Sequence, residues 1–194
     1  MSMITAIILA AGQSIRMGEP KLLLPWGKST VLQTVVSVLQ SAGVDEALVV
    51  TGAMREEVEA LIGRSVQTVF NPAYAEGKML SSIQAGLAEK QREARAALIC
   101  LGDQPQVQVR SVQRILQIYH RTGASIVVPS FEKRRGHPWL VGREHWDEIL
   151  AMKTPETLRD FLNRHASKIR YLEVNTPSVL ADLDTPNEYL KSKP

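Results

Sequence analysis

Short apolar runs of strand length, separated by stretches with a helical repeat, constrain the fold of this chain more than any other feature. Four runs are almost continuously apolar: residues 4–9, 47–50, 96–101 and 125–128. Such runs are typical of parallel strands covered on both faces. Two others, residues 66–70 and 169–174, alternate more between apolar and polar residues. They are expected at the edges of the same sheet.

Apolar residues at i, i+3 and i+4 spacing fall between these runs and predict helices. They are Val31, Leu32, Val35, Val36 and Leu39 in one segment, Val112, Ile115, Leu116 and Tyr119 in another, and Met79, Ile83 and Leu87 in a third. A chain of 194 residues suits one domain. We therefore predict a single α/β domain over residues 1–194, a Rossmann-like three-layer sandwich with a mainly parallel sheet.

Local sequence also marks helix starts. Thr30 with Gln33 and Thr185 with Glu188 fit capping boxes, and Thr154 before Pro155 fits an N-cap followed by proline. Residues 131–141 break the alternation of strands and helices and predict a hairpin or excursion. Departures of this kind often carry functional residues.

Composition agrees with a folded domain and excludes several other classes of protein. Hydrophobic residues make up 44% and charged residues 22% of the chain, and the net charge is +3. Neither disorder nor nucleic-acid binding is therefore indicated. The first apolar run lacks preceding basic residues, which is atypical of a signal peptide or membrane span. The single cysteine, Cys100, is expected as a small buried hydrophobe, and we expect a cytoplasmic protein.

The loop after the first strand has the composition of a phosphate cradle. Small residues at the strand end let backbone N–H groups approach a ligand, and Arg16 and Lys21 add cationic donors. Neither the Walker spacing nor the dinucleotide-binding glycine spacing is present. Taken by composition alone, the segment also fits a flexible surface loop.

Two acidic segments are candidates for a metal site. Asp103 follows the strand at residues 96–101, and Mg²⁺ typically uses one or two carboxylates plus substrate phosphates. Asp182 and Asp184 stand at i and i+2, so in extended backbone both point the same way. The alternatives are structural: an aspartate often stabilises a turn, and Asp184 with Thr185 can simply begin the last helix.

Two other segments carry polar residues. Asn71 begins a turn before a helix that contains Ser81 and Ser82, which can cap that helix or contact a nucleotide. Residues 132–143 carry a net charge of +3, equal to that of the whole chain, and suit an anionic ligand or a solvated basic turn. The histidines at positions 120, 145 and 165 have no metal-binding spacing, so no zinc site is predicted.

Several ordered motifs resemble the MobA-like nucleotidyltransferases. They are LAAGQSIRMG at residues 9–18, KLLLP at 21–25, NPAYAEGKMLSSI at 71–83, GDQP at 102–105, RGHP at 135–138 and DLDTP at 182–186. The LAAG and KLLLP forms are most similar to the molybdenum cofactor cytidylyltransferase branch, within the nucleotide-diphospho-sugar transferase fold. Lys78 is an extra residue between the glycine and methionine of the third motif.

The resemblance implies a role for each matching residue. Catalytic roles fall to Arg16, Lys21 and Asp103, and metal binding to Asp103 and Asp184. Nucleotide contacts fall to Leu9, Ala10, Ala11, Gly12, Arg16, Lys21, Asn71, Ser82, Gly102 and Asp103. Acceptor contacts fall to Gln104, Arg135, His137 and Asp182. Either Asp182 or Asp184 can be the second metal ligand.

The resemblance further implies transfer of a nucleotidyl group from an NTP, with CTP favoured, to a phosphorylated acceptor. The implied acceptor is the molybdenum-molybdopterin cofactor, the cofactor ion is Mg²⁺, pyrophosphate is released, and a molybdenum hydroxylase apo-enzyme is a possible partner. GTP, or another small phosphorylated acceptor, is an alternative. A second alternative is a non-catalytic cofactor carrier, although a carrier would not need Arg16, Lys21 and Asp103 together.

Overall fold

A mainly parallel sheet forms the centre of the molecule. The computed structural model describes residues 3–76, 78–90, 92 and 94–194. The sheet consists of β1 (Ile4–Ala10), β4 (Glu46–Thr51), β5 (Gln67–Phe70), β6 (Ala96–Leu101), β7 (Ile126–Phe131), β8 (Arg134–Arg135), β9 (Trp139–Gly142) and β10 (Ile169–Glu173). Its order is β10-β7-β9-β6-β1-β4-β5, with β8 paired to β7. The fold class predicted from the sequence is confirmed, and β5 and β10 are the edge strands as expected.

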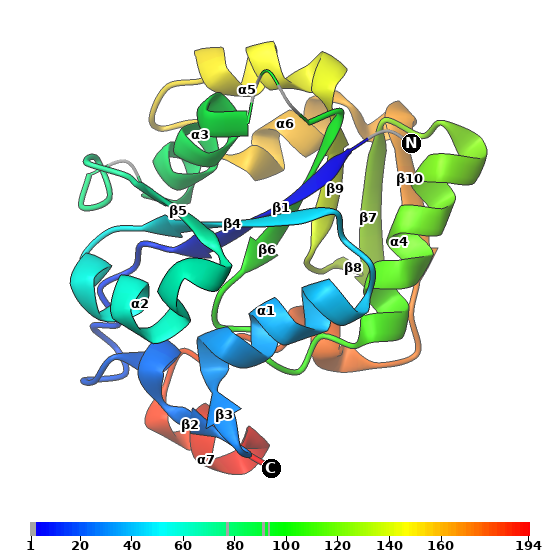
Figure 1. The fold of residues 1–194 in the computed structure, drawn as a ribbon. Coiled ribbons are helices and arrows are strands. Elements are labelled where there is room, and N and C mark those ends of the chain that lie inside the picture. Colours follow the sequence, from blue (N-terminus) through cyan, green and yellow to red (C-terminus); the bar gives the residue numbers. More distant parts are fainter. Residues whose placement is uncertain (1–2, 77, 91, 93) are drawn as a thin grey trace.

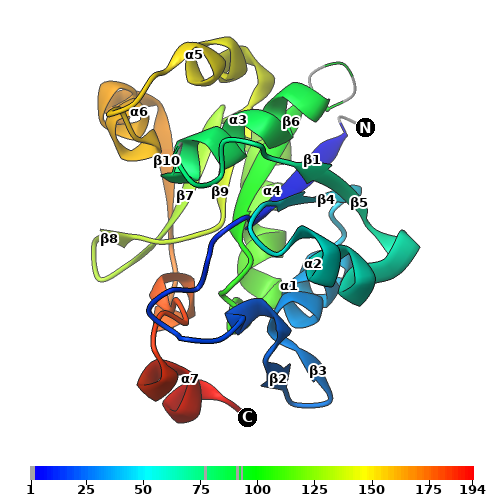
Figure 2. The ribbon, with the colours of Figure 1, turned by 90° about the vertical axis from the view of Figure 1, so that its left-hand side faces the viewer.

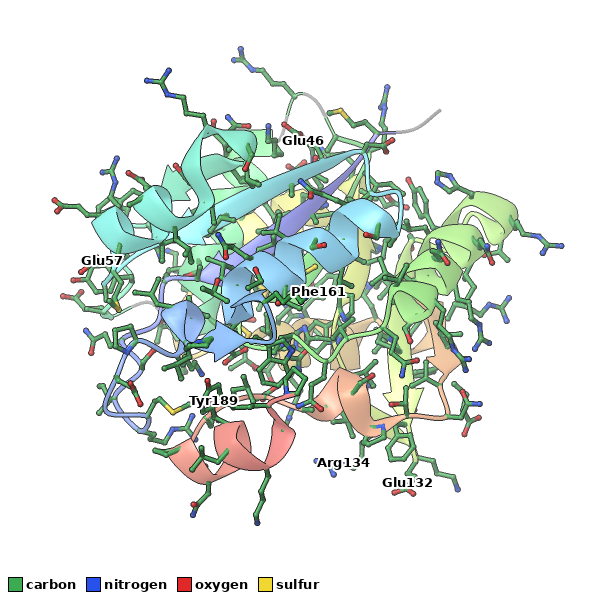
Figure 3. All side chains as sticks on the ribbon, turned by 60° about the horizontal axis from the view of Figure 1, so that its bottom comes forward. Glu46, Glu57, Glu132, Arg134, Phe161 and Tyr189 are labelled. Atoms are coloured by element: carbon green, nitrogen blue, oxygen red, sulfur yellow. The ribbon has the colours of Figure 1, made fainter. Side chains whose placement is uncertain are left out.

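Within this sheet, antiparallel pairing of the described strands is confined to the excursion after β7. β1 is parallel to β4 and β6, whereas β9 is antiparallel to both β6 and β7. β8 forms a hairpin with β7 in the predicted segment. Figure 3 shows Glu132 and Arg134 at the outer surface of this hairpin.

Helices cover both faces of the sheet (Figures 1 and 2). On one face lie α1 (Val31–Ser41), α2 (Arg55–Ile62) and α4 (Val109–Thr122), and on the other lie α3 (Lys78–Lys90), α5 (Trp146–Ala151) and α6 (Leu158–Arg164). Each central strand serves both layers, because successive side chains point to opposite faces. Leu98 and Cys100 of β6 join the core under α1, whereas Ala97 and Ile99 join the core under α3. Both faces of the central strands are therefore buried.

The chain ends in a small subassembly beside the loop after β1. The hairpin β2 (Pro25–Trp26) and β3 (Ser29–Thr30) packs against α7 (Pro186–Ser192), as Figure 2 shows. Tyr189 donates a hydrogen bond from its hydroxyl to the carbonyl of Pro25 at 2.7 Å. Residues from the two ends of the chain thus form one wall. No described helix is both long and apolar enough to cross a bilayer.

The local predictions for helices need two corrections. Thr154 does not cap a helix: α6 begins at Leu158, and Thr157 forms the capping box with Asp160. On α3 the buried residues include Leu80, Ile83 and Leu87, whereas Met79 is exposed. Leu80 takes the buried place instead of Met79. It lies three residues before Ile83, a spacing that also puts two side chains on one face of a helix, here the face toward the sheet.

Thr185 caps α7 with a full capping box, as predicted. Thr30 is the N-cap of α1 as expected. The side chain of Gln33 does not complete the capping box, and its Nε2 donates to the carbonyl of Leu61 at 3.1 Å. Cys100 is buried, and burial raises the pKa of its thiol.

Close packing of α3 on β1 leads to a stability prediction. A Cβ on Gly86 would lie 2.4 Å from Cγ2 of Ile7. We expect Gly86→Ala to destabilise the fold by about 1–3 kcal/mol, because a well-packed core resists added volume. Urea denaturation measures this, with exposed Glu89→Ala on the same helix as the control, expected within about 0.5 kcal/mol of wild type. Equal stability of both variants would contradict tight packing at this contact.

Candidate active site

The ammonium group of Lys21 lies between two carboxylates that come from distant parts of the chain. Lys21 begins a 3₁₀ turn (Lys21–Leu23) after the loop that follows β1. Its Nζ donates to Asp103, directly after β6, and to Oδ1 of Asp184 at 3.0 Å. All three side chains are largely withdrawn from solvent, with exposed fractions of 15%, 16% and 26%. The predicted grouping of these residues is present in the structure.

Backbone contacts hold the two acidic segments together. The amide of Leu183 donates to the carbonyl of Asp103 at 3.2 Å, and the Leu183 side chain is fully buried. Because side chains alternate along extended backbone, Asp182 and Asp184 turn the other way, into the pocket. At the strand ends, the amide of Gly102 donates to the carbonyl of Leu9 at 3.0 Å. A side chain at Gly102 would collide with that carbonyl.

Charge in this cluster is balanced across short contacts. Burial opposes ionisation of Lys21, but the charges of Asp103 and Asp184 outweigh it and raise the lysine pKa. Burial likewise opposes ionisation of Asp184, yet Lys21 and Arg16 lower its pKa. Nη2 of Arg16 lies 2.8 Å from Oδ2 of Asp184, while the arginine side chain stays 71% exposed. Arg16 is therefore free to turn toward a bound anion.

A pocket of about 380 Å³ opens beside this cluster. Its walls include Leu9, Ala10, Ala11, Gly12, Arg16, Lys21, Ser82, Asp103, Asp182 and Asp184. The small residues at the end of β1 leave backbone accessible, as expected for a phosphate cradle. The pocket lies beyond the carboxyl ends of β1 and β6, where open α/β sheets bind ligands.

Asn71 lies behind this pocket and organises the loop after β5. Asn71 is buried, with 2% of the residue exposed. Nδ2 donates to Oγ of Ser81 at 2.9 Å and to Oγ of Ser82 at 3.0 Å, and Oδ1 accepts from the amide of Ala73 at 3.0 Å. Asn71 thus fixes the start of α3 and the position of Ser82. The side chain of Lys78 lies outside the described residues.

A second and larger pocket of about 540 Å³ adjoins the first, with Met79, Leu101 and Asp182 lining both. It contains Gln104, Arg135 and His137, which the sequence predicted to share one site. Arg135 is positioned by hydrogen bonds from Nε to the hydroxyl of Tyr171 at 2.9 Å and from Nη1 to Oδ1 of Asn163 at 2.7 Å. The first pocket, which contains the aspartates, and the second pocket, which contains Arg135, therefore meet at Asp182.

Asp182 and Gln104 form a polar contact at the junction of the pockets. Nε2 of the buried Gln104 donates to Oδ1 of Asp182, and Oε1 of Gln104 has no hydrogen-bond partner among the described residues. Partial burial raises the pKa of Asp182, and the carboxylates of Asp103 and Asp184 act in the same direction. Because this acceptor is buried, the Gln104 side chain would have to turn before a ligand in the pocket could donate a hydrogen bond to it.

The basic segment is less compact than its sequence suggests. Arg135 lines the second pocket, but Arg143 lies beyond the other end of β9, where its guanidinium packs 5.2 Å from the ring of Trp146. The whole of β9 lies between the two arginines in the chain, so they lie toward opposite ends of this strand. The expected single cluster of positive charge is therefore wrong, and only its first half faces the pocket.

Sequence reasoning missed one wall of the second pocket. This wall consists of residues 154–157, which lie between α5 and α6, of Leu158 and Arg159 in the first turn of α6, and of Met79 on α3. No sequence signal pointed to Met79, because its spacing to Ile83 and Leu87 predicted a place on the buried face of the helix. Arg159 carries no local signal, because an exposed arginine on a short helix is usually solvated.

The sheet order, the cationic loop and the carboxylates around Lys21 define a nucleotide-handling α/β enzyme. A family model described as the MobA-like NTP transferase domain matches residues 6–169. The chain belongs to this family, as its motifs predicted, and is a nucleotidyltransferase.

Curated relatives and solved structures are similar to this chain over nearly all of its length. The molybdenum cofactor cytidylyltransferase of Escherichia coli is 29% identical, covering 100% of this chain and 97% of the relative. The nicotine blue oxidoreductase of Paenarthrobacter nicotinovorans is also 29% identical, covering 94% and 92%. Crystal structures of Rv0371c from Mycobacterium tuberculosis superpose with TM-scores of 0.84 and, in complex with manganese, 0.81, at 28% and 27% identity. They cover 98% of this chain and 96% and 97% of theirs.

His137 leads to a prediction for the pH dependence of stability. It stacks on Trp139 with ring centroids 4.3 Å apart, and burial lowers its pKa to about 4. The unfolded chain, with an ordinary histidine pKa of about 6.5, binds the proton first as the pH falls. Stability is therefore lost between about pH 6.5 and pH 4, by at most roughly 1.4 kcal/mol per pH unit.

His137→Phe keeps an aromatic ring on Trp139 and removes this titration. Urea denaturation at several values between pH 7.5 and pH 4 should show a smaller loss of stability in this variant than in wild type. The same substitution at the exposed His120 should leave the wild-type pH dependence unchanged. Parallel stability curves for wild type and His137→Phe would contradict the burial of a neutral imidazole.

Proposed function

We propose that this protein transfers the cytidylyl group of CTP to the terminal phosphate of molybdenum-bound molybdopterin and releases pyrophosphate. One observation carries the proposal: two adjoining pockets share Asp182, and the cluster of Lys21, Asp103 and Asp184 lines the smaller pocket beside it. Nucleotidyl transfer needs this layout, because an acceptor phosphate must attack the α-phosphorus opposite to the leaving pyrophosphate.

The smaller pocket is assigned to the nucleotide. Backbone at Leu9, Ala10, Ala11, Gly12 and Gly102 would contact the base and phosphates, with Ser82 at the far wall and Asn71 positioning it. Arg16 and Lys21 would bind the triphosphate and stabilise charge that develops on the departing pyrophosphate. Correct placement of the two substrates would supply most of the rate enhancement, without a protein nucleophile.

Asp103 and Asp184 are assigned to a divalent cation, for which we favour Mg²⁺. The donor set fits, because two carboxylates already converge on one cationic group, the ammonium of Lys21. Oxygen ligands suit Mg²⁺ and Mn²⁺, and the solved Rv0371c complex contains manganese. A bound cation would neutralise phosphate charge, while Lys21 moves from the carboxylates toward the triphosphate.

The larger pocket is assigned to the acceptor. Arg135 is held by Tyr171 and Asn163 in a position to bind an anionic group. The stacked rings of His137 and Trp139 and the amide of Gln104 suit a planar, polar pterin. Similarity over the full length of the E. coli cytidylyltransferase supports CTP as the donor. The product would serve a molybdenum hydroxylase apo-enzyme in the cytoplasm.

The relative named an oxidoreductase supports a second candidate, a redox reaction on a planar aromatic substrate in the larger pocket. The carboxylates around Lys21 favour nucleotidyl transfer, since a hydride transfer has no need for them. Absorbance of a reduced nicotinamide cofactor, followed with a planar aromatic oxidant present, tests the redox candidate directly, because hydride transfer to the oxidant would consume the reduced cofactor.

The transfer itself is tested by incubating the protein with Mg²⁺, molybdenum-bound molybdopterin and each of the four NTPs. We expect pyrophosphate release with CTP and a cytosine dinucleotide product identified by mass spectrometry. Turnover with GTP alone would overturn the cytidylyl assignment. Absence of pyrophosphate with every NTP would overturn the assigned reaction.

Asp103→Asn tests the proposed cation site. Loss of one carboxylate charge at the reacting phosphates should lower kcat by about 10²- to 10³-fold and raise the Mg²⁺ concentration needed for half-maximal rate. Asp147→Asn, at a largely exposed carboxylate on α5, should leave both quantities unchanged. Wild-type kcat in Asp103→Asn would refute the role of this carboxylate.

Arg135→Gln tests the assignment of the larger pocket. We expect the KM for the acceptor to rise at least tenfold, because a charge-assisted hydrogen bond contributes about 1.5–3 kcal/mol, while the KM for CTP stays constant. Lys133→Gln, at an exposed turn residue outside the pocket, is the control. An equal rise in both KM values would indicate a general defect rather than an acceptor contact.

A further inference from the structure

We propose that His145, Glu148 and His165 form a binding site for a divalent transition-metal ion of the zinc type. The three side chains offer ligand atoms that all lie within 4.8 Å of one another. Nε2 of His165 and Oε2 of Glu148 are already 2.6 Å apart. Two imidazoles and one carboxylate are a common ligand set for zinc, with water in the fourth position.

The geometry requires only small adjustments to hold an ion. Zinc bonds of about 2.0–2.1 Å place two tetrahedral ligands roughly 3.3 Å apart. The two closest ligand atoms, Nε2 of His165 and Oε2 of Glu148, would move slightly apart, and the two most distant ligand atoms would move closer together. His165 and Glu148 are partly exposed and can make these movements, whereas His145 is buried at 5% exposure and supplies a fixed ligand.

Neighbouring side chains orient the ligands in the way that supporting residues do at established metal sites. Oγ of Ser125 lies 2.9 Å from Nε2 of His145 and fixes that ring. Nε of Arg164 donates to Oε1 of Glu148 at 3.1 Å, which leaves Oε2 toward His165. Arg164 is itself balanced by Glu156 at 2.8 Å, so its charge does not stand alone beside the site.

The cluster is separate from the proposed active site. His145 ends the turn after β9, Ser125 precedes β7, and His165 follows α6. These positions lie at the amino ends of the parallel strands β7 and β10, whereas Lys21 and Asp103 lie beyond the carboxyl ends of other strands. The imidazoles of His145 and His165 also pack on Phe161, with ring centroids 5.5 and 4.7 Å away.

An ion here would join α5 to the end of α6. The turn between these helices, residues 152–157, contributes Thr154, Pro155, Glu156 and Thr157 to the wall of the larger pocket. Glu148 and His165 are 17 positions apart in the sequence, too far for a short zinc motif, so the fold brings His165 to the other two ligands. The site would stabilise the pocket wall rather than take part in nucleotidyl transfer.

Zn²⁺ binding to the untagged, chelator-treated protein tests the proposal, with millimolar Mg²⁺ present to occupy carboxylate sites. Isothermal titration and elemental analysis should give one Zn²⁺ per chain, and Co²⁺ should give the visible absorption of a tetrahedral nitrogen and oxygen site. His165→Gln should weaken Zn²⁺ binding at least tenfold, and His145→Gln should do the same. In both variants, the increase in melting temperature that Zn²⁺ causes should be lost together with Zn²⁺ binding.

His120→Gln, at an exposed histidine of α4, and Asp103→Asn should both retain the wild-type affinity for Zn²⁺. Circular dichroism checks that each variant is folded, and the partly exposed His165 remains decisive if His145→Gln does not fold. Equal affinity in wild type and His165→Gln, loss of binding in Asp103→Asn, or no Zn²⁺ bound to wild type would overturn the proposal. None of these outcomes depends on the nucleotidyltransferase reaction.

Discussion

The contact of Lys21 with Asp103 and Asp184 is the interaction on which the arrangement of the site depends. It joins the loop after the first strand, the end of the central strand β6 and the segment before the last helix. Two carboxylates this close repel each other unless a cation lies between them. With Lys21 in place, segments from the beginning, the middle and the end of the chain share one charge-balanced cluster. Arg16 extends this cluster to the surface.

This cluster explains why a site of this kind can accept a polyphosphate. Removing one charge from a largely buried ion pair leaves the other uncompensated, so the lysine leaves its carboxylates only if other charges replace it. In the proposed function, a triphosphate with its divalent cation would supply both replacements at once: anionic oxygens for Lys21 and a cation for Asp103 and Asp184. Such an exchange would couple nucleotide binding to cation binding.

The sheet forms the smaller pocket, which we assign to the nucleotide, and the excursion after β7 forms much of the larger pocket, which we assign to the acceptor. β1 and β6 are buried on both faces, and their ends are joined by the hydrogen bond from Gly102 to Leu9. The larger pocket is built instead from the β8 hairpin, β9 and the turn between α5 and α6. The proposed metal site would stabilise the same excursion from its far end.

Local sequence determined most of the strands, the order of strands and helices, the edge position of β5 and β10, and the residues around the phosphate loop. These features follow from burial and backbone chemistry within short segments, which a repeat of two or 3.6 residues records. Local sequence failed at Thr154, because a second threonine three residues later offers a better capping box, and at Met79, because Leu80 competes for the same buried face. Only the tertiary structure decided which charges share a site. It separated Arg143 from Arg135 across the length of β9, placed Asn71 behind the pocket, and brought His145, Glu148 and His165 together, because contacts between distant segments leave no periodic trace in the sequence.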